Sequence, residues 1–304
     1  MSRYNIFRGA ATALATPFAD DGSVDLETLG KLIDRQISVG IDAVVLCGTT
    51  GESPTLAADE KIEIWRYARE RIDKAERRVP LIAGTGGNDT DVAVRLSHSA
   101  ELCGVDALLV VTPYYNKTSQ FGIAEHYRRI AAGVSLPIIV YTVPSRTGIN
   151  ISSAAWRELF SIPNVVAVKD ATGDLRHTAM LAGMCRDMGD EAVDIYSGDD
   201  ELTLPVLACG GAGVISVTSN IIPGEMHEIC RLFFDGKCGE ALQTWQHALP
   251  LMRAMFCDVN PIPLKYAMAE LGLCSPYLRL PLVPLEDANR SIVMDALQKV
   301  LPIR

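Results

Sequence analysis

The sequence predicts an α/β protein, a (β/α)8 TIM barrel with a C-terminal helical extension. Three observations support this fold class. Short apolar runs alternate with longer segments of helical period, the runs end at nearly regular intervals, and the last part of the chain continues with helical period alone. The eight apolar runs span residues 9–16, 42–47, 80–84, 106–112, 137–142, 165–169, 193–198 and 213–217.

The spacing of these runs predicts parallel strands. The first six intervals between successive predicted strand ends are 28 to 36 residues long, and the last is 18. Such intervals fit strands that are joined by helical crossovers. Eight strands suit a closed barrel better than an open doubly wound sheet, which usually has about six, although the open sheet stays the alternative on spacing alone. The predicted strand ends are Thr16, Gly48, Gly84, Thr112, Tyr141, Lys169, Gly198 and Ser216.

Helices are predicted where apolar residues recur at i, i+3 and i+4. Between the early strands this pattern covers residues 26–40, 59–78 and 122–134. It returns after the eighth unit without any low-complexity linker. We therefore expect a barrel with the active site over residues 1–236 and a docked helical segment over 237–304. The helical patterns of that segment cover residues 239–256, 263–273 and 287–301.

Composition excludes several classes of protein. The 304 residues are 48% hydrophobic and 21% charged, with a formal net charge of −9 and no run of Lys or Arg. Nucleic acid and anionic membrane are therefore not expected as partners. We expect neither a signal peptide nor a membrane span, because the start lacks an apolar core and no apolar stretch approaches 18 residues. The eight scattered cysteines, without a C-x-x-C pair, predict mostly buried, reduced thiols and a cytoplasmic protein.

Functional groups of such barrels cluster at the C-terminal ends of the strands. Lys169 is conspicuous there, because it directly follows the apolar run "VVAV" and lysine is among the residues least often buried. It is either an ordinary strand-end lysine paired with a neighbour such as Asp170, or a nucleophile that forms a Schiff base. Apolar surroundings favour the second reading, because they lower a lysine pKa and leave neutral amine.

Five other side chains follow strands at the same predicted mouth. Tyr141 can transfer protons during imine formation or simply fill the barrel. Thr49 and Thr50 lie between glycines, in a loop that suits either carboxylate binding or an ordinary turn. Tyr115 belongs to a tyrosine doublet, a pattern that more often serves packing. Arg146 is either solvated or binds a second carboxylate with two N–H groups.

Other chemistries fit less well. Asp199 and Asp200 suit a helix cap and a first-turn acid better than a metal site, and they disfavour a phosphate site. The segment "GTGGND" (84–89) lacks the last glycine of the dinucleotide pattern. Metal catalysis needs converging ligands, but all histidines fall in helical stretches: His98, His126, His177, His227 and His247.

The motifs together resemble a known family. They include "ATPF" (15–18), "GTTGES" (48–53), "IAGTGGN" (82–88), "TPYYN" (112–116), "VPSRTG" (143–148), "VKDATGD" (168–174), "SGDD" (197–200), "GVISVTSN" (213–220) and "NPIPLKYAMAELGL" (260–273). In this order they resemble the dihydrodipicolinate synthase family, within the pyruvate-dependent class I aldolase superfamily that includes N-acetylneuraminate lyase. The resemblance covers nearly the whole chain.

The resemblance implies an aldolase-type lyase of lysine and diaminopimelate biosynthesis. Lys169 would form a Schiff base with pyruvate, and the enamine would attack L-aspartate-4-semialdehyde. Tyr141, Thr49 and Tyr115 would form the proton relay, with Tyr115 contributed by a neighbouring subunit. The family implies a homotetramer built as a dimer of dimers, with neither a metal nor an organic cofactor.

The resemblance also implies residues that bind substrate. Thr50 would hold the pyruvate carboxylate, and Arg146 the carboxylate of the semialdehyde. The Ile215 main chain and Gly198 would line the pyruvate pocket. One departure is Thr142, where the synthases typically have Asn. The alternatives are a retro-aldol lyase that releases pyruvate from a sialic acid or a 2-keto-3-deoxy sugar acid, and a non-catalytic barrel that senses a keto acid.

Feedback inhibition by lysine is expected to be weak. Ser53, Asn88 and Tyr114 match the effector site of lysine-sensitive relatives. Nearby helix positions carry Ala58, Lys61 and Val92, where those relatives have a His or a Glu. A cationic and an apolar side chain there would weaken the binding of a cationic effector.

Overall fold

The computed structural model describes residues 6–301, and its eight strands form a closed parallel barrel in the order β1 to β8. The predicted (β/α)8 fold class is confirmed. Residues 1–5 and 302–304, the outer ends of the two predicted segments, lie outside the described residues. The strands are β1 (Gly9–Ala13), β2 (Ala43–Leu46), β3 (Leu81–Gly84), β4 (Ala107–Val111), β5 (Ile138–Thr142), β6 (Val165–Asp170), β7 (Asp194–Ser197) and β8 (Gly213–Ser216).

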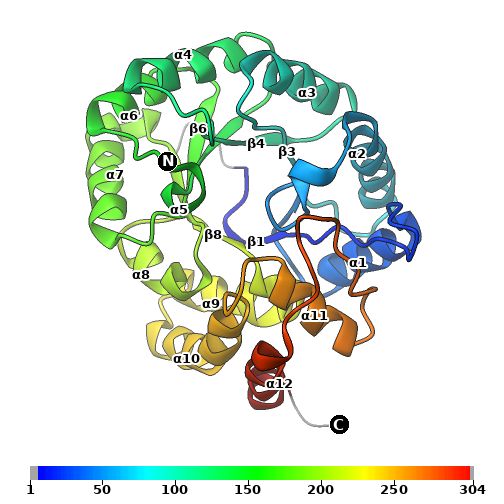
Figure 1. The fold of residues 1–304 in the computed structure, drawn as a ribbon. Coiled ribbons are helices and arrows are strands. Elements are labelled where there is room, and N and C mark those ends of the chain that lie inside the picture. Colours follow the sequence, from blue (N-terminus) through cyan, green and yellow to red (C-terminus); the bar gives the residue numbers. More distant parts are fainter. Residues whose placement is uncertain (1–5, 302–304) are drawn as a thin grey trace. The chain divides into compact units, whose positions relative to one another are not determined.

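Helices follow the strands along the chain (Figure 1). The α-helices are α1 (Leu26–Ser38), α2 (Ala58–Asp73), α3 (Thr90–Leu102), α4 (Gln120–Ala131), α5 (Pro144–Thr147), α6 (Ser153–Phe160), α7 (Leu175–Met188), α8 (Thr203–Ala208), α9 (Pro223–Phe234), α10 (Cys238–Ala254), α11 (Ile262–Glu270) and α12 (Asp287–Val300). The short 3-10 helices are η1 (Ser53–Thr55), η2 (Gly189–Glu191), η3 (Asp200–Leu202) and η4 (Thr218–Asn220).

Local sequence explains where these elements begin and end. Each predicted apolar run contains one strand, but most runs extend further, because buried residues such as Leu14 and Ala15 continue into the following loop. Strand β6 is the exception, since it reaches Asp170, one residue beyond the predicted end. Several helices start where a short polar side chain accepts a hydrogen bond from a first-turn N–H group. These caps are Asp25, Asp89, Ser119, Ser152 and Asp174.

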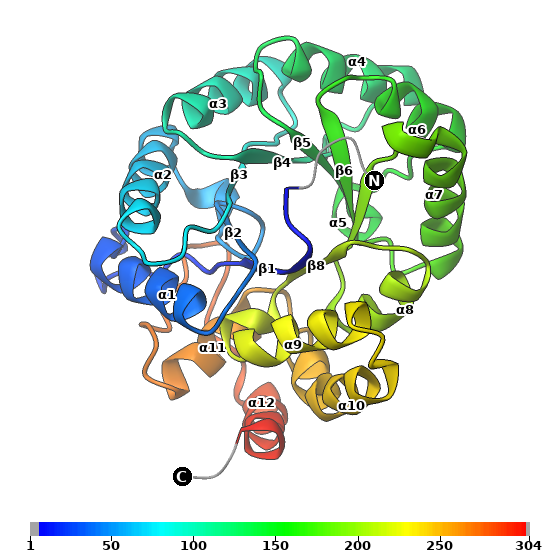
Figure 2. The same cartoon turned by 180° about the vertical axis from the view of Figure 1, so that it is seen from behind.

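The chain divides into two compact units. The first contains residues 80–215 and the described residues up to Arg8. Its strands β3 to β7 pair in parallel with their neighbours, and β7 pairs with β8. Helices α3, α4, α6 and α7 lie outside strands β3 to β6 (Figures 1 and 2). Strands β5 and β6 are buried along their whole length, as expected of strands with both faces covered.

The second unit contains residues 9–79 and those from 216 onward. It pairs β1 with β2 in parallel and includes α1, α2 and the helices α9 to α12. Helix α10 packs against both α9 and α12, as Figure 2 shows. This division does not test the expected boundary after residue 236, which stays a prediction.

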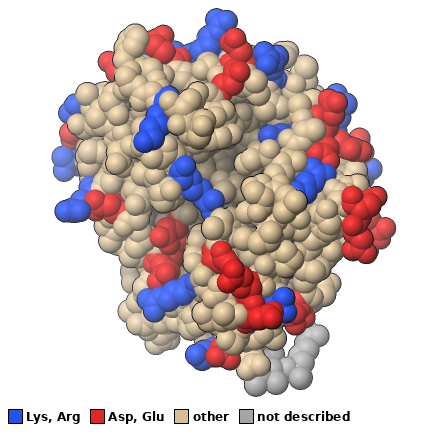
Figure 3. Space-filling model, viewed as in Figure 1, with Lys and Arg blue, Asp and Glu red and all other residues tan. Residues whose placement is uncertain are grey.

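On the face drawn in Figure 3, acidic and basic side chains lie interspersed, in keeping with the modest net charge of −9. Among residues 6–301, no helix combines the length and the apolar character that crossing a bilayer requires.

Candidate active site

Lys169 lies near the end of β6, within the first compact unit. Four apolar residues with no solvent exposure, Val165 to Val168, precede it, and Lys169 itself is 5% exposed. Its Nζ lies 4.5 Å from the ring centroid of Tyr141. Burial disfavours the ammonium ion and lowers the pKa of Lys169 to about 8. A substantial share of neutral amine at physiological pH is the condition that nucleophilic attack requires.

Two charged residues modulate this lysine with opposite signs. The Asp200 carboxylate opposes the effect of burial and raises the pKa of Lys169, whereas the Arg146 guanidinium lowers it. Asp200 is 2% exposed and begins η3, and the side chain of Asp199 caps this short helix by accepting from the Glu201 N–H at 3.0 Å. The expected cap is confirmed at Asp199. The electrostatic effect of Asp200 on Lys169 was not predicted from the sequence.

Tyr141 stands on the neighbouring strand, directly beside Lys169. The Cα atoms of the two residues are register partners between β5 and β6, so both side chains project from the same level of the strands. Tyr141 is 7% exposed. The structure therefore brings together the amine and the phenol that the sequence placed at two successive strand ends.

Asp170 turns away from Lys169 and anchors the end of β6. Its carboxylate accepts from the Thr178 hydroxyl at 2.8 Å and lies 3.1 Å from Nδ1 of His177. Nε2 of His177 accepts from the Trp156 indole at 3.1 Å, which leaves Nδ1 as the donor to Asp170. Burial alone would raise the pKa of Asp170, but these hydrogen bonds lower it. The reading of Asp170 as the ion-pair partner of Lys169 is therefore not supported.

Arg146 projects from a single helical turn after β5. Pro144 begins α5, and Gly148 ends it with φ 67°, where its N–H donates to the Pro144 carbonyl at 2.8 Å. A Cβ atom at Gly148 would lie 2.8 Å from Cε of Lys117, so this turn packs against the loop after β4. Arg146 is exposed at this position. A short, capped turn thus holds a guanidinium whose charge reaches Lys169.

The loop after β4 presents Tyr115 to solvent. Tyr115 is 90% exposed and has φ +66°, a left-handed conformation that is uncommon outside glycine. Asn116 fixes the loop, because its side chain donates to the Asn88 carbonyl at 2.8 Å and its N–H to the Tyr114 carbonyl at 2.9 Å. The loop therefore holds Asn88 near Tyr114 and directs the neighbouring phenol outward. The Tyr115 side chain is therefore accessible to another molecule.

Gly198 and Ile215 occupy strand ends of the same unit. The Gly198 N–H donates to the Asp170 carbonyl at 2.7 Å, and a Cβ atom at this glycine would lie 2.6 Å from Cβ of Ala171. Only glycine fits this close approach between the ends of β6 and β7. Ile215 is fully buried in β8.

The second unit carries the threonine pair in a rigid loop. Thr50 is 2% exposed, and its Oγ1 accepts from Nδ2 of Asn260 at 3.0 Å. Thr49 is half-buried, and its carbonyl accepts from the Glu52 N–H at 3.0 Å. Cys47 and Glu52 flank the loop with φ values of 56° and 54°. Two left-handed residues so close together give a sharp turn whose conformation the surrounding contacts must hold.

The residues expected around an effector are divided between the units. Ser53 begins η1 in the second unit and is half-buried, and Ala58 is exposed. Lys61 was expected to repel a cationic effector, but it is only 8% exposed and burial lowers its pKa, opposed by nearby Cys47. Helical periodicity did not predict this burial. Val92 is 38% exposed in the first unit.

The remaining polar candidates are not grouped as a metal site. Within residues 6–301, no cluster of three or more His, Cys, Asp or Glu side chains could hold an ion. All eight cysteines are free thiols, of which Cys238 is exposed. The histidines lie in helices as predicted: His98 in α3, His126 in α4, His177 in α7, His227 in α9 and His247 in α10.

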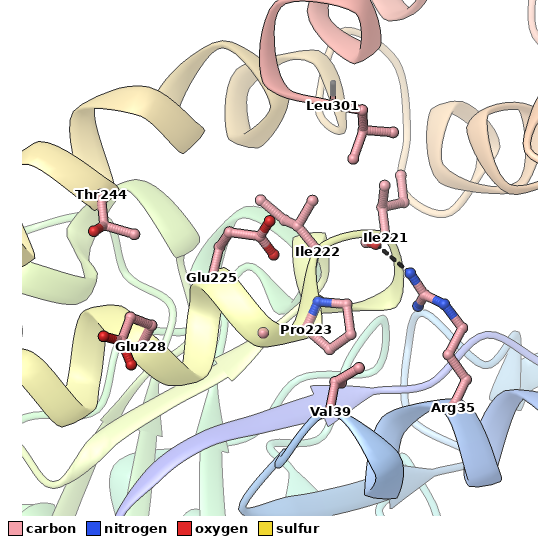
Figure 4. Close-up of a pocket in the computed structure, with 10 residues that line it drawn as sticks. Arg35, Val39, Ile221, Ile222, Pro223, Glu225, Glu228, Thr244 and Leu301 are labelled. Atoms are coloured by element: carbon pink, nitrogen blue, oxygen red, sulfur yellow. Dashed lines mark hydrogen bonds between the residues drawn. The ribbon is translucent and has the colours of Figure 1, made fainter. Parts of the chain in front are cut away.

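A cavity of about 570 Å³ lies in the second unit, at the start of α9. Figure 4 shows Arg35 reaching toward it from α1, but the guanidinium donates to the carbonyls of Asn220 at 2.9 Å and Ile221 at 2.6 Å. Glu228 on its wall pairs with Arg231 at 2.6 Å. Arg35 and Glu228 are thus already engaged, and none of the described residues that line the cavity is a lysine.

Comparison with known proteins shows the family of the chain. The model of the Dihydrodipicolinate synthetase family matches residues 6–300. The chain belongs to this family. The motifs from "ATPF" to "NPIPLKYAMAELGL", which carried the resemblance, all lie inside the matched range.

Individual relatives of the dihydrodipicolinate synthetase family match over nearly their whole length. A 4-hydroxy-tetrahydrodipicolinate synthase of Caldicellulosiruptor saccharolyticus is 47% identical over 292 residues, 96% of each chain. The solved dihydrodipicolinate synthase of Thermotoga maritima superposes with a TM-score of 0.93 at 37% identity, covering 97% of this chain and 99% of the other. The enzyme of Cyanidioschyzon merolae, solved with lysine bound, gives 0.92 at 36% identity, with coverages of 98% and 99%.

Proposed function

We propose that the chain is a 4-hydroxy-tetrahydrodipicolinate synthase, a lyase that condenses pyruvate with L-aspartate-4-semialdehyde in lysine and diaminopimelate biosynthesis. The observation that carries this proposal is Lys169, a buried lysine with its pKa lowered to about 8 beside the Tyr141 ring, in a chain of this family. Relatives of the same name at up to 47% identity support the reaction.

The reaction begins with the neutral amine of Lys169. The amine attacks the keto carbon of pyruvate, and loss of water gives an imine. Loss of a proton from the methyl carbon converts the imine to an enamine, whose carbon attacks the aldehyde of the semialdehyde. The amino group of that substrate then attacks the imine carbon, closes the ring and releases Lys169 as a free amine. Tyr141, Thr49 and Tyr115 are the proposed proton relay for these steps.

The other candidate residues bind and orient substrate in this proposal. Thr50 binds the pyruvate carboxylate, with Gly198 and the Ile215 main chain along the pocket. Arg146 binds the carboxylate of the semialdehyde, because an exposed guanidinium on a short rigid turn can form two parallel bonds with it. Its charge also helps to keep the pKa of Lys169 low.

A comparison of substrates tests the reaction. We expect condensation of pyruvate with L-aspartate-4-semialdehyde and no pyruvate release from sialic acid or 2-keto-3-deoxy sugar acids. Arg146→Ala should raise the KM of the semialdehyde by about 10- to 100-fold, the scale of a lost charge-assisted hydrogen bond, and change pyruvate KM little. Arg129→Ala, on the outer helix α4, is the matched control. Faster cleavage of a sugar acid than condensation would make the lyase alternative correct.

We propose further that Tyr115 acts in the active site of a neighbouring subunit within a homotetramer. Its 90% exposure and left-handed backbone support this, because they direct the phenol away from its own chain. Mixing inactive Lys169→Ala with inactive Tyr115→Phe tests the proposal. If Tyr115 crosses between subunits, each mixed pair regains one complete site, and activity returns. If Tyr115 serves its own subunit, no complete site forms and the mixture stays inactive.

The proposal includes no metal and no organic cofactor, because an imine chemistry of this kind needs only the lysine and proton-transfer groups. We propose a cytoplasmic location, which the eight free cysteines support, since disulfides form mainly outside that compartment. Lysine binding near Ser53, Asn88 and Tyr114 is proposed to be weak.

A further inference from the structure

The C-terminal helical segment contacts the proposed substrate-binding threonine directly. Asn260 precedes α11 and lies 210 residues from Thr50 along the chain. Its side-chain Nδ2 donates to Oγ1 of Thr50 at 3.0 Å, and both residues are nearly inaccessible to solvent, at 5% and 2% exposed. The contact lies wholly within the second compact unit. The amide nitrogen of Asn260 can only donate, so Oγ1 of Thr50 is the acceptor in this hydrogen bond.

The direction of this bond determines what the Thr50 hydroxyl can do next. A threonine hydroxyl has one proton to donate and two lone pairs that accept. Because Asn260 donates, one lone pair of Oγ1 is used and the hydroxyl proton remains for another acceptor. A carboxylate accepts hydrogen bonds and cannot donate them when ionised. Asn260 therefore leaves the Thr50 hydroxyl proton available for donation to a carboxylate.

The same segment also holds the loop in place. The Glu52 carboxylate pairs with Nζ of Lys265 at 2.6 Å, and both side chains are fully buried. Nζ of Lys265 also donates to the Tyr277 carbonyl at 2.8 Å, and the Arg279 N–H donates to the Glu52 carboxylate at 3.1 Å. Desolvation lowers the pKa of Lys265, and the Glu52 carboxylate opposes this effect. Loss of either partner of this buried pair would leave an uncompensated charge, so the pair ties the loop to α11.

We propose that Asn260 is a positioning residue for substrate binding, which keeps the Thr50 hydroxyl oriented as a donor to the carboxylate of a 2-keto acid. On this view the C-terminal segment, held to the loop through Glu52 and Lys265, completes the binding site for pyruvate. The inference rests on the role proposed above for Thr50. It adds a residue that the sequence motifs alone did not single out.

Two substitutions at Asn260 separate this role from a general contribution to stability. Asn260→Asp nearly preserves shape, but its carboxylate cannot donate, so the Thr50 hydroxyl turns toward it and is lost to the substrate. We expect the pyruvate KM to rise about 10- to 100-fold, as for a lost hydrogen bond to a charged group. Asn260→Ala leaves the hydroxyl free but unoriented and should raise the pyruvate KM less. A merely structural asparagine would show the reverse order, because alanine removes more packing.

A double-mutant cycle with Thr50→Val provides the decisive measurement. Valine removes the hydroxyl and keeps the branched shape, so Asn260 then has nothing to orient. We expect Asn260→Ala to change the pyruvate KM less than about twofold in the Thr50→Val background, and clearly more in the wild type. The semialdehyde KM should stay unchanged in every variant. Asn289→Ala, in α12 of the same segment, is the control and should leave both KM values unchanged.

Trapping of pyruvate on Lys169 with borohydride distinguishes a failure of the proposed function from a failure of the role proposed for Asn260. A wild-type chain that is not trapped contradicts the proposed function itself. A trapped wild type with additive effects in the cycle, or with an unchanged pyruvate KM in Asn260→Asp, overturns only the role of Asn260. If Asn260→Asp does not fold, judged by its melting temperature, the cycle with Asn260→Ala decides the same question.

Discussion

Replacing either charged neighbour of Lys169 should move the pH at which this amine reacts, and the two replacements should move it in opposite directions. Arg146 lowers the pKa of Lys169 and Asp200 raises it. Arg146→Gln should therefore shift the reactive range to higher pH, and Asp200→Asn to lower pH. Both substitutions remove a charge and keep a polar side chain, and Asp200→Asn also keeps its size.

The structure sets the scale of this experiment. Burial lowers the pKa of Lys169 from the ordinary 10.5 to about 8. At pH 7 this raises the neutral fraction of the amine by about 300-fold, to roughly one molecule in ten. The same difference corresponds to roughly 3 kcal/mol at 1.36 kcal/mol per factor of ten. Burial of the reactive Lys169 amine therefore lowers the free energy of unfolding at pH 7.

The assay is the initial rate of reductive trapping of pyruvate on Lys169 with cyanoborohydride, followed across neutral and alkaline pH. We expect the wild-type rate to rise with pH to a midpoint near 8 and to level off above it, because the neutral amine is the nucleophile. A midpoint near 10.5 would show that burial does not activate the lysine. Shifts of the same sign in both variants would refute the electrostatic account of Arg146 and Asp200.

Three further predictions follow from the same contacts. Lys169→Met should raise the free energy of unfolding at pH 7 by up to about 3 kcal/mol, because the pKa of Lys169 is lower in the folded chain than in the unfolded chain. Denaturant titrations should show that this gain shrinks as the pH rises from 8 toward 10.5. Gly198→Ala should lower the free energy of unfolding by about 1–3 kcal/mol in the same titrations, because its Cβ would lie 2.6 Å from that of Ala171; an unchanged value would mean that the strand ends shift freely. Millimolar lysine should leave initial rates nearly unchanged, because the exposed Val92 offers no charge to pair with a cationic effector, and strong inhibition would contradict this expectation.

The fold was predictable because parallel barrel strands are covered on both faces. Their residues then read as continuous apolar runs, and β5 and β6 are indeed buried along their whole length. The same logic drew attention to Lys169 in the sequence, since a charged residue that directly follows such a run is rare. Its neighbour Tyr141 was predictable for the same reason, as both lie at strand ends in register.

Contacts between distant segments were not predictable in this way. Nothing in the local pattern around Asn260 indicates that its amide donates to Thr50, 210 residues away. The buried pair of Glu52 and Lys265 is equally invisible, because each residue alone suits an exposed position. Asp200 shows the boundary between the two cases: local spacing predicted a helix start, but only the fold brings its charge to Lys169.

Borohydride reduction in the presence of pyruvate, followed by peptide mass mapping, tests the central claim most directly. We predict one reduced pyruvate adduct per chain, on the peptide that contains Lys169, and none in Lys169→Ala. The buried Lys61 and Lys265 are internal controls, because they share a lowered pKa but lack the Tyr141 neighbour. An adduct on either of them, or no adduct at all, would contradict the account.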